Sequence, residues 1–160
     1  MAESIKYFNE SKIIAGGEDC FGEPRGLGVS EILFKVVPEN ENGIFVIENV
    51  FHEKGGPARH LHYDQDEWFY ALEGEFNLVI GDSKHILCAG DSILAPKNLP
   101  HVWAFTGNQE IGRMLIAFTP AGNMEAFFRE VTKENAMPPM DPKLWEAHGM
   151  KLMGPPLTLD

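Results

Sequence analysis

The sequence predicts an all-β domain, a sandwich or a barrel, followed by one or two short helices. Eight short runs rich in β-branched and aromatic residues lie between Ser30 and Pro120, and Gly, Pro, Asn or Asp bounds each run. Strands at such even spacing are typical of sandwiches and barrels, with jelly rolls among the options. After Thr119 the apolar residues recur at helical spacing instead.

The predicted strands are connected by turns that favour hairpins. Gly74, Gly81 and Gly90 each lie between two neighbouring runs, where glycine can adopt the positive φ of a tight turn. We therefore expect a meander of hairpins and not a set of helical crossovers. The predicted strands cover residues 32–37, 43–51, 67–73, 75–80, 85–88, 91–95, 101–106 and 111–119.

The segment after the strands predicts two short helices. Apolar residues at i, i+3, i+4 and i+7 predict a helix over about 123–132, with Asn123 as its N-cap and the Phe127–Phe128 pair on its packing face. Asp141-Pro142 can begin a second helix that ends at Gly149. The Gly- and Pro-rich tail that follows is expected to be extended.

The chain is predicted to divide into three parts. Residues 1–29 are polar and Gly-rich, with Tyr7–Phe8 and Ile13–Ile14 as short apolar anchors, and predict an irregular arm that can include a short strand. Residues 30–120 form the barrel, and residues 121–160 form C-terminal helices and a tail packed on it. A length of 160 residues is sufficient for one domain with a buried core.

The composition argues against several classes of partner. The formal net charge is −11, whereas a nucleic acid or an anionic membrane surface requires a basic face. No apolar run approaches the roughly 18 residues of a membrane helix, and the first residues do not resemble a signal peptide. Cys20 and Cys88 lie far apart in a chain that needs no disulfide, which favours a reducing compartment. We therefore expect a cytoplasmic protein whose partner is a small molecule.

One segment near the middle of the chain predicts a metal site. His60 and His62 are two residues apart, so in an extended chain both imidazoles point to the same side. Glu67 begins the next strand and returns a carboxylate toward that side if the intervening residues form a turn. Neutral imidazoles with a carboxylate form a site suited to iron, manganese, nickel, copper or zinc.

The same segment resembles the first motif of the cupin superfamily. In that motif His-x-His follows a Gly-rich lead, and a glutamate and then a glycine come after it. The family allows Asp66 as well as Glu67 at the carboxylate position, but the interval to Gly74 favours Glu67. The motif positions are occupied by Gly55-Gly56-Pro57, His60, His62, Glu67 and Gly74.

A later segment resembles the second cupin motif. Gly90, Pro96 and His101 match it at the family's intervals, and in the family the histidine is a metal ligand. Asn98 stands where the family has glycine, a mild change because asparagine tolerates left-handed backbone angles. Phe105 replaces a final asparagine that does not bind the metal in the family.

The resemblance implies a cupin jelly-roll β-barrel that binds one divalent ion through His60, His62, Glu67 and His101. Within the superfamily the chain is similar to the small, single-domain cupins of the quercetin 2,3-dioxygenase type. That similarity implies a metal-dependent oxygenase acting on a small enolic or phenolic substrate, such as a flavonol or a catechol. As a weak ligand, Glu67 can also be the base that accepts the substrate proton. A homodimer is the habit of the family.

The alternation of side chains along the strands predicts apolar surroundings for this site. If Glu67 and His101 face the barrel interior, then Phe69, Trp103 and Phe105 face inward too, either as pocket walls or as barrel core. The opposite face of these strands is also apolar, and we expect a second layer or a subunit to cover it.

Two other classes of function remain open. The first is an isomerase, epimerase or decarboxylase that acts on a sugar or an organic acid, although cupins acting on sugars usually have more polar groups inside the barrel. The second is a non-enzymatic module that binds a small ligand. Fold alone does not decide among these functions.

Overall fold

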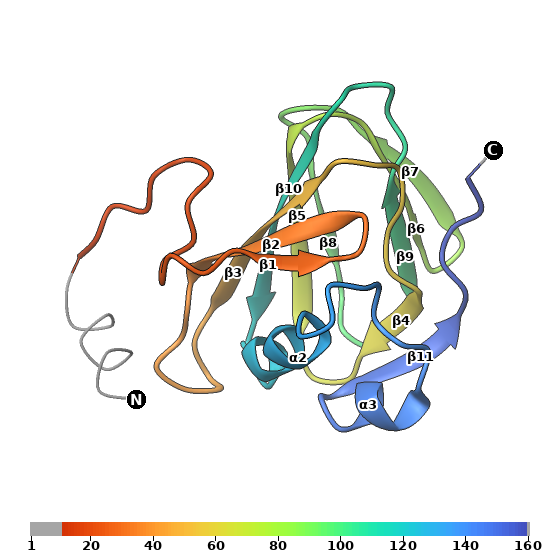
Figure 1. The fold of residues 1–160 in the computed structure, drawn as a ribbon. Helices are drawn as coiled ribbons and strands as arrows, with labels where there is room; N and C mark the ends of the chain where they lie inside the picture. Colours follow the sequence, from red (N-terminus) through yellow and green to blue (C-terminus); the bar gives the residue numbers. More distant parts are fainter. Residues whose placement is uncertain (1–10, 160) are drawn as a thin grey trace.

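Two antiparallel sheets enclose a shared core in a computed structural model, which describes residues 11–159 (Figure 1). The strands of the larger sheet are β1 (Arg25–Leu27), β2 (Ser30–Val36), β3 (Phe45–Phe51), β5 (Asp66–Glu73), β8 (Ser92–Ala95) and β10 (Gly112–Thr119). Their order across the sheet is β1-β2-β3-β10-β5-β8.

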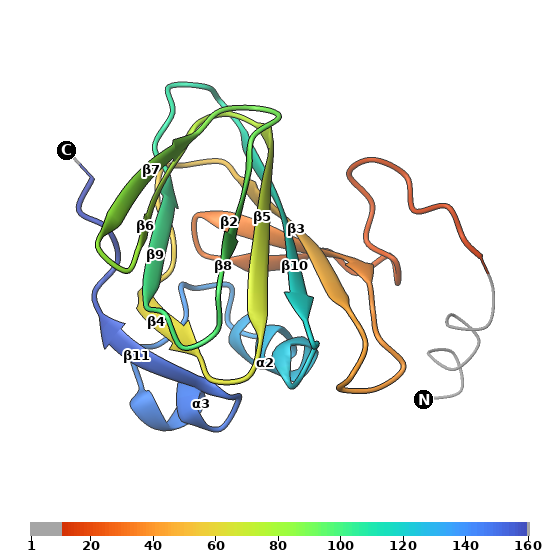
Figure 2. The same cartoon turned by 180° about the vertical axis from the view of Figure 1, so that it is seen from behind.

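The smaller sheet faces the larger one and has five strands in the described part of the chain. They are β4 (Arg59–His62), β6 (Phe76–Ile80), β7 (Ser83–Leu87), β9 (His101–Phe105) and β11 (Met150–Gly154). Their order is β11-β4-β9-β6-β7, and the view from behind shows β8 beside β5 in one sheet and β9 beside β6 in the other (Figure 2). From β3 onward, strands that follow one another in the chain alternate between the two sheets, except for β6 and β7.

The jelly-roll β-barrel with two short helices is confirmed, but the predicted meander of hairpins is wrong. Gly74, Gly81 and Gly90 do have positive φ angles, of 86°, 59° and 95°. Only Gly81 lies in a hairpin, between β6 and β7, because β5 pairs with β8 and β6 pairs with β9. The turns at Gly74 and Gly90 connect strands of different sheets. Inward-facing residues are apolar in both sheets, so the strand pattern does not indicate which sheet a strand joins.

The strands β4 and β11 lie outside the eight predicted strands. The segment of β4 was expected to be extended, whereas β11 was not predicted. In β11 the sequence Met-Lys-Leu-Met-Gly has no β-branched residue, so its composition does not favour a strand. It forms by pairing with β4, with Met150 opposite His62 and Leu152 opposite His60.

The two described helices lie at one end of the barrel, near β4 and β11 (Figure 1). They are α2 (Met124–Val131) and α3 (Pro142–Glu146). Asn123 occupies the N-cap position of α2 without a side-chain capping bond, whereas the Asp141 side chain accepts a hydrogen bond from the Lys143 backbone N–H. Neither helix has the length and the continuous apolar sequence that crossing a bilayer requires.

A buried aspartate connects the segment before β2 to the larger sheet. The Asp19 side chain has no exposed surface and forms a 3.0 Å ion pair with Arg25. It also accepts hydrogen bonds from the backbone N–H groups of Phe21, Glu23 and Phe34, and the last of these lies in β2. Asp19 therefore holds the chain leading into β1 against β2.

Of the two predicted apolar anchors, only one lies in the described part of the chain. Ile14 packs against the core while its neighbour Ile13 is 93% exposed. The anchor Tyr7–Phe8 lies outside the described residues. The division of the chain after residues 29 and 120 stays a prediction.

Aromatic rings fill much of the space between the sheets. Phe51 contacts Trp103 edge-to-face with centroids 5.4 Å apart, and Phe34 contacts Phe45 in the same way at 5.1 Å. Such pairs stabilise a core beyond the area that they bury. The fully buried phenylalanines are Phe34, Phe45, Phe51, Phe69, Phe76, Phe105 and Phe118.

Candidate metal centre

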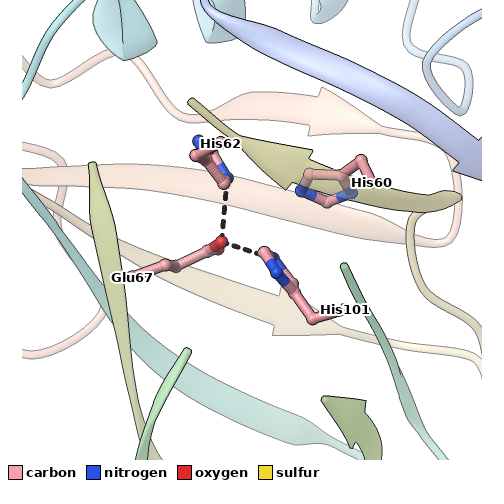
Figure 3. Close-up of side chains that lie close together, drawn as sticks. All are labelled: His60, His62, Glu67 and His101. Atoms are coloured by element: carbon pink, nitrogen blue, oxygen red, sulfur yellow. Dashed lines mark hydrogen bonds and ion pairs between the residues drawn. The ribbon is translucent and has the colours of Figure 1, made fainter. Parts of the chain in front are cut away.

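Three histidines and one glutamate converge inside the barrel (Figure 3). One potential ligand atom from each of His60, His62, Glu67 and His101 lies within 4.8 Å of the other three, and all four residues are buried. The Glu67 Oε2 atom is 2.7 Å from His101 Nε2 and 2.9 Å from His62 Nε2. The structure therefore brings together the four residues that the sequence predicts as ligands, and this group could bind a metal ion.

Both sheets contribute to this cluster. His60 and His101 are directly opposite each other on β4 and β9. His62 lies two residues farther along β4, so its side chain emerges on the same face. Glu67 comes from β5 in the larger sheet, where it is opposite Phe118 of β10. The cluster thus spans the interior from one sheet to the other.

The turn before β9 fixes the position of His101 relative to β4. Asn98 has a φ of 64°, the left-handed conformation that was expected at this position, and its backbone N–H donates to the His62 carbonyl at 2.7 Å. The Lys97 backbone N–H donates to Asp66 Oδ1 at 2.9 Å. Asp66, the alternative carboxylate, is therefore bonded to this turn and lies outside the cluster.

Two of the imidazoles have a backbone acceptor at Nδ1. His60 Nδ1 is 2.7 Å from the Ala58 carbonyl, and His101 Nδ1 is 3.4 Å from the Leu99 carbonyl, a weaker contact. A carbonyl oxygen only accepts, so these contacts favour the tautomer with the proton on Nδ1. In that tautomer Nε2 has a lone pair available for a metal ion.

Gln65 imposes the same tautomer on His62. Its amide nitrogen donates to the carbonyls of Pro120 and Ala121 at 2.8 and 3.0 Å, so its amide oxygen faces His62 Nδ1, 2.6 Å away. Because an amide oxygen only accepts, His62 Nδ1 carries the proton. The His62 Nε2 atom therefore presents a lone pair to the cluster.

That lone pair indicates that the cluster fits a cation. Within residues 11–159, His62 Nε2 is buried without a hydrogen-bond partner, although it lies 2.9 Å from Glu67 Oε2. Two lone pairs facing each other at this distance repel, whereas a cation between them attracts both. Bonds of about 2.0–2.2 Å place neighbouring ligand atoms roughly 3.0–3.5 Å apart, so small side-chain movements bring the cluster around an ion.

Burial and mutual attraction set the charges of the cluster. Burial, followed by the charges of His101 and His62, lowers the pKa of His60 to about 3. Burial alone would raise the pKa of Glu67, but positive charge beside the carboxylate, whether on protonated His101 and His62 or on a cation bound between them, holds that pKa below its usual range. At neutral pH the site therefore offers a neutral His60 imidazole and a carboxylate, the forms that bind metal.

A cavity of about 40 Å³ adjoins the cluster, and His60, His62 and Glu67 line it. A space of this size holds roughly three water molecules. Its other walls are almost entirely apolar and come from both sheets and from the C-terminal segment. They are Leu27, Ser30, Ile47, Asn49, Phe51, Gly56, Pro57, Trp103, Ile116, Phe118, Met124, Phe127, Phe128, Met137, Pro138, Trp145 and Met150.

Of the three aromatic residues predicted around the site, Trp103 lines the cavity, and Phe69 and Phe105 do not. The Phe69 ring packs against Trp103, with centroids 5.6 Å apart. Phe105, at the far end of β9, packs against Phe76 at 5.5 Å. Both therefore belong to the barrel core, which was the other role that the alternation of side chains allowed for them.

Gln65 and the C-terminal wall of the cavity were not predicted as parts of the site. Phe127 and Phe128 were predicted as the packing face of a helix, and they line the cavity as well. Trp145 of α3 lies over the cluster, with its ring 4.9 Å from that of His60. The position of Gln65 three residues after His62 was a usable signal, because a side chain in the turn after a ligand can reach back to it.

Comparison with protein families identifies this part of the chain. The family model described as the cupin domain matches residues 49–118, a stretch that contains the whole four-residue cluster. No curated protein matches the chain.

Several solved structures are similar in fold. KdgF from Halomonas sp. is 15% identical with a TM-score of 0.58, over 69% of this chain and 94% of that chain. An RmlC-like cupin from Shewanella frigidimarina is 22% identical with a TM-score of 0.53, over 69% and 93%. Pac13 from Streptomyces, described as a nucleoside dehydratase, is 10% identical with a TM-score of 0.59, over 92% and 95%. At these identities the similarity concerns the fold alone.

Proposed function

Because the chain is a member of the cupin superfamily, with its cupin domain at residues 49–118, we propose that it is a metal-dependent oxygenase. Its substrate is a small enolic or phenolic molecule of the flavonol or catechol type. The observation that supports this most is the convergence of three imidazoles and one carboxylate beside a cavity with mostly apolar walls. Apolar walls favour an aromatic ring over a sugar, and a cavity of this size has to widen before it admits one.

The residues of the site have separate roles in this proposal. The histidines and Glu67 hold a divalent ion, which supplies the Lewis acidity that lowers the pKa of a bound hydroxyl. Glu67 is a carboxylate at the centre of the cluster and accepts the hydroxyl proton. Dioxygen then adds to the electron-rich substrate, and both oxygen atoms remain in the product, so no external reductant is consumed.

Oxygen uptake tests the proposal. The purified protein is loaded in turn with iron, manganese, nickel, copper or zinc and screened against catechols, flavonols and other enols in an oxygen electrode. We expect uptake with at least one metal, with one dioxygen consumed for each substrate molecule. Glu67→Gln keeps the size of the side chain without the base, and we expect it to lower the rate at least about 100-fold.

The same screen separates the alternatives. Substrate conversion without oxygen uptake would support an isomerase, epimerase or decarboxylase instead. Binding without conversion, for every metal, would support a ligand-binding protein. The scarcity of polar groups on the cavity wall favours the oxygenase over an enzyme that acts on sugars.

We further propose that the protein acts in the cytoplasm as a homodimer. Cys20 is buried and Cys88 is exposed, and the two form no disulfide with each other, as is usual in a reducing compartment. Half-buried Trp68 and Tyr70 lie on the outward face of β5, with ring centroids 5.7 Å apart, where a second subunit would cover them.

A further inference from the structure

Trp103 has a buried hydrogen-bond donor that nothing in the protein satisfies. The residue is 3% exposed, and its indole N–H has no acceptor among residues 11–159. Four buried polar side-chain atoms of the described residues lack a partner, and two of them belong to residues that line the cavity. These two are His62 Nε2, explained above by a metal ion, and Trp103 Nε1.

The ring of Trp103 is held in place by its neighbours. Phe51 and Phe69 contact it edge-to-face with centroids 5.4 and 5.6 Å away, and Phe76 lies at 6.1 Å. A ring packed on several sides cannot turn to find an acceptor elsewhere. Leaving a buried donor unpaired is costly, so a ligand that supplies an acceptor is favoured over one that does not.

Trp145, in the wall of the same cavity, provides a comparison for the unpaired indole N–H of Trp103. It also lines the cavity and is 1% exposed. Its indole N–H, however, donates to the Pro139 carbonyl at 2.9 Å. One tryptophan of the cavity wall therefore has its donor satisfied by the protein, and the other does not.

We propose that Trp103 N–H recognises an acceptor oxygen on the bound ligand, beside the oxygen that binds the metal. The inference rests on the metal-binding part of the proposed function. His101 and Trp103 are two residues apart on β9, both buried, so their Cα atoms are about 6.6 Å apart. A single small ring with two oxygens can therefore reach both the metal and the indole.

The charges around the cavity restrict the ligand further. Among the described residues that line it there is no lysine or arginine, and Glu67 is the only acidic one. A carboxylate or phosphate group away from the metal would therefore be buried without a cationic partner. The ligand is accordingly an uncharged ring that carries one metal-binding hydroxyl and one further acceptor oxygen.

Two pairs of small phenols test this specificity. Each pair replaces an acceptor oxygen by a methylene group of similar size: 2-methoxyphenol with 2-ethylphenol, and 3-methoxyphenol with 3-ethylphenol. Their affinities for the zinc-loaded protein are measured by calorimetry. In at least one pair we expect the methoxyphenol to bind on the order of tenfold more tightly.

Two substitutions assign the preference to one indole. Trp103→Phe should abolish the preference, because it removes the donor and keeps an aromatic ring. Trp145→Phe removes an indole of the same cavity whose N–H is already bonded, so it should keep the preference even if it weakens both ligands. Because the result is a ratio of two affinities, general effects on folding or on metal binding cancel.

The indole N–H resonances provide a direct measurement. The three tryptophans give three such signals, and the one missing in Trp103→Phe belongs to Trp103. We expect this signal to move downfield with the methoxyphenol and to move less with the ethylphenol. An unchanged ratio in Trp103→Phe, no preference in either pair, or no binding of any of the four phenols would overturn the proposal. Failure of the oxygenase screen alone would leave this result unaffected, because zinc supports binding without oxygen chemistry.

Discussion

Gln65 orients His62, one of the four candidate metal ligands, although it is not part of the cluster itself. Its amide is held by the carbonyls of Pro120 and Ala121, and the remaining oxygen accepts the His62 Nδ1 proton. Without that acceptor the His62 ring could change its tautomer or its orientation, and Nε2 would no longer be reserved for the metal. Partners of this kind contribute to affinity through the ligand that they orient.

We expect Gln65→Leu to weaken metal binding by about 10- to 100-fold. The leucine has a similar size but neither accepts the His62 proton nor donates to the two carbonyls. Competition with a chromophoric chelator measures the affinity. Asp66→Asn, the adjacent residue outside the cluster, is the control and should bind metal as the unmodified protein does. Equal affinities for all three proteins would show that Gln65 has no part in orienting His62.

For individual residues, the sequence was sufficient to predict the four candidate ligands but not the residues that hydrogen-bond to them. The spacing of His60 and His62 and the family intervals to Glu67 and His101 are local patterns, and the four residues do meet. The bonds of Gln65 join it to carbonyls 55 and 56 residues later in the chain. No local pattern encodes such a contact, just as none indicates that the Trp103 N–H lacks an acceptor.

At the level of secondary structure, the position of the segment leading into β1 depends on one side chain, that of Asp19. Asp19 is fully buried and accepts hydrogen bonds from three backbone N–H groups and from Arg25, whose side chain is 10% exposed. The Arg25 guanidinium in turn lies over the Phe34 ring, 3.9 Å from its centroid. Removing the carboxylate takes the acceptor from three backbone N–H groups and leaves a mostly buried Arg25 paired only with the exposed Glu23 carboxylate.

Asp19→Ala should therefore lower the free energy of unfolding by about 3 kcal/mol. Urea denaturation followed by tryptophan fluorescence measures this. Glu23→Ala is a suitable control, because the Glu23 side chain is 65% exposed and its ion pair with Arg25 should contribute less than about 1 kcal/mol. A comparable loss in both variants would contradict the role given to Asp19.

A strand was predictable where the composition of its own residues favours a strand. Each of the eight predicted runs is a strand in the structure, because alternating apolar residues require a half-buried sheet. The pairing was not predictable, since the glycines at the turns of Gly74 and Gly90 have a positive φ like Gly81 in the hairpin. In β11 the strand is imposed by β4, so its own residues gave no signal.

For the molecule as a whole, the metal site connects the two sheets. Glu67 belongs to the larger sheet, and the three histidines belong to the smaller one. An ion bound by both sheets binds the folded protein and not the unfolded chain. Such binding adds its free energy to the stability of the fold.

Metal loading should therefore raise the melting temperature. At a free metal concentration 1,000 times the dissociation constant, the added stability is about 4 kcal/mol. Calorimetry before and after chelator treatment measures the shift, and elemental analysis gives the metal content. His60→Ala and His101→Ala should lose both the metal and the shift, whereas His85→Ala, on β7 outside the cluster, should keep both. A shift that persists in the first two variants would place the ion elsewhere.

The cavity wall formed by the C-terminal segment affects which metal ion the purified protein contains. Trp145 packs against His60 at a tilted angle, and Phe127 packs against Trp145 with centroids 5.1 Å apart. We expect an ion behind these rings to escape only when the segment or the barrel opens, which is a slow event in a packed protein. Several divalent ions compete for the same donors, so the one captured as the chain folds is retained. The metal content of a purified sample will then record the supply of ions in the producing cell more than the preference of the site.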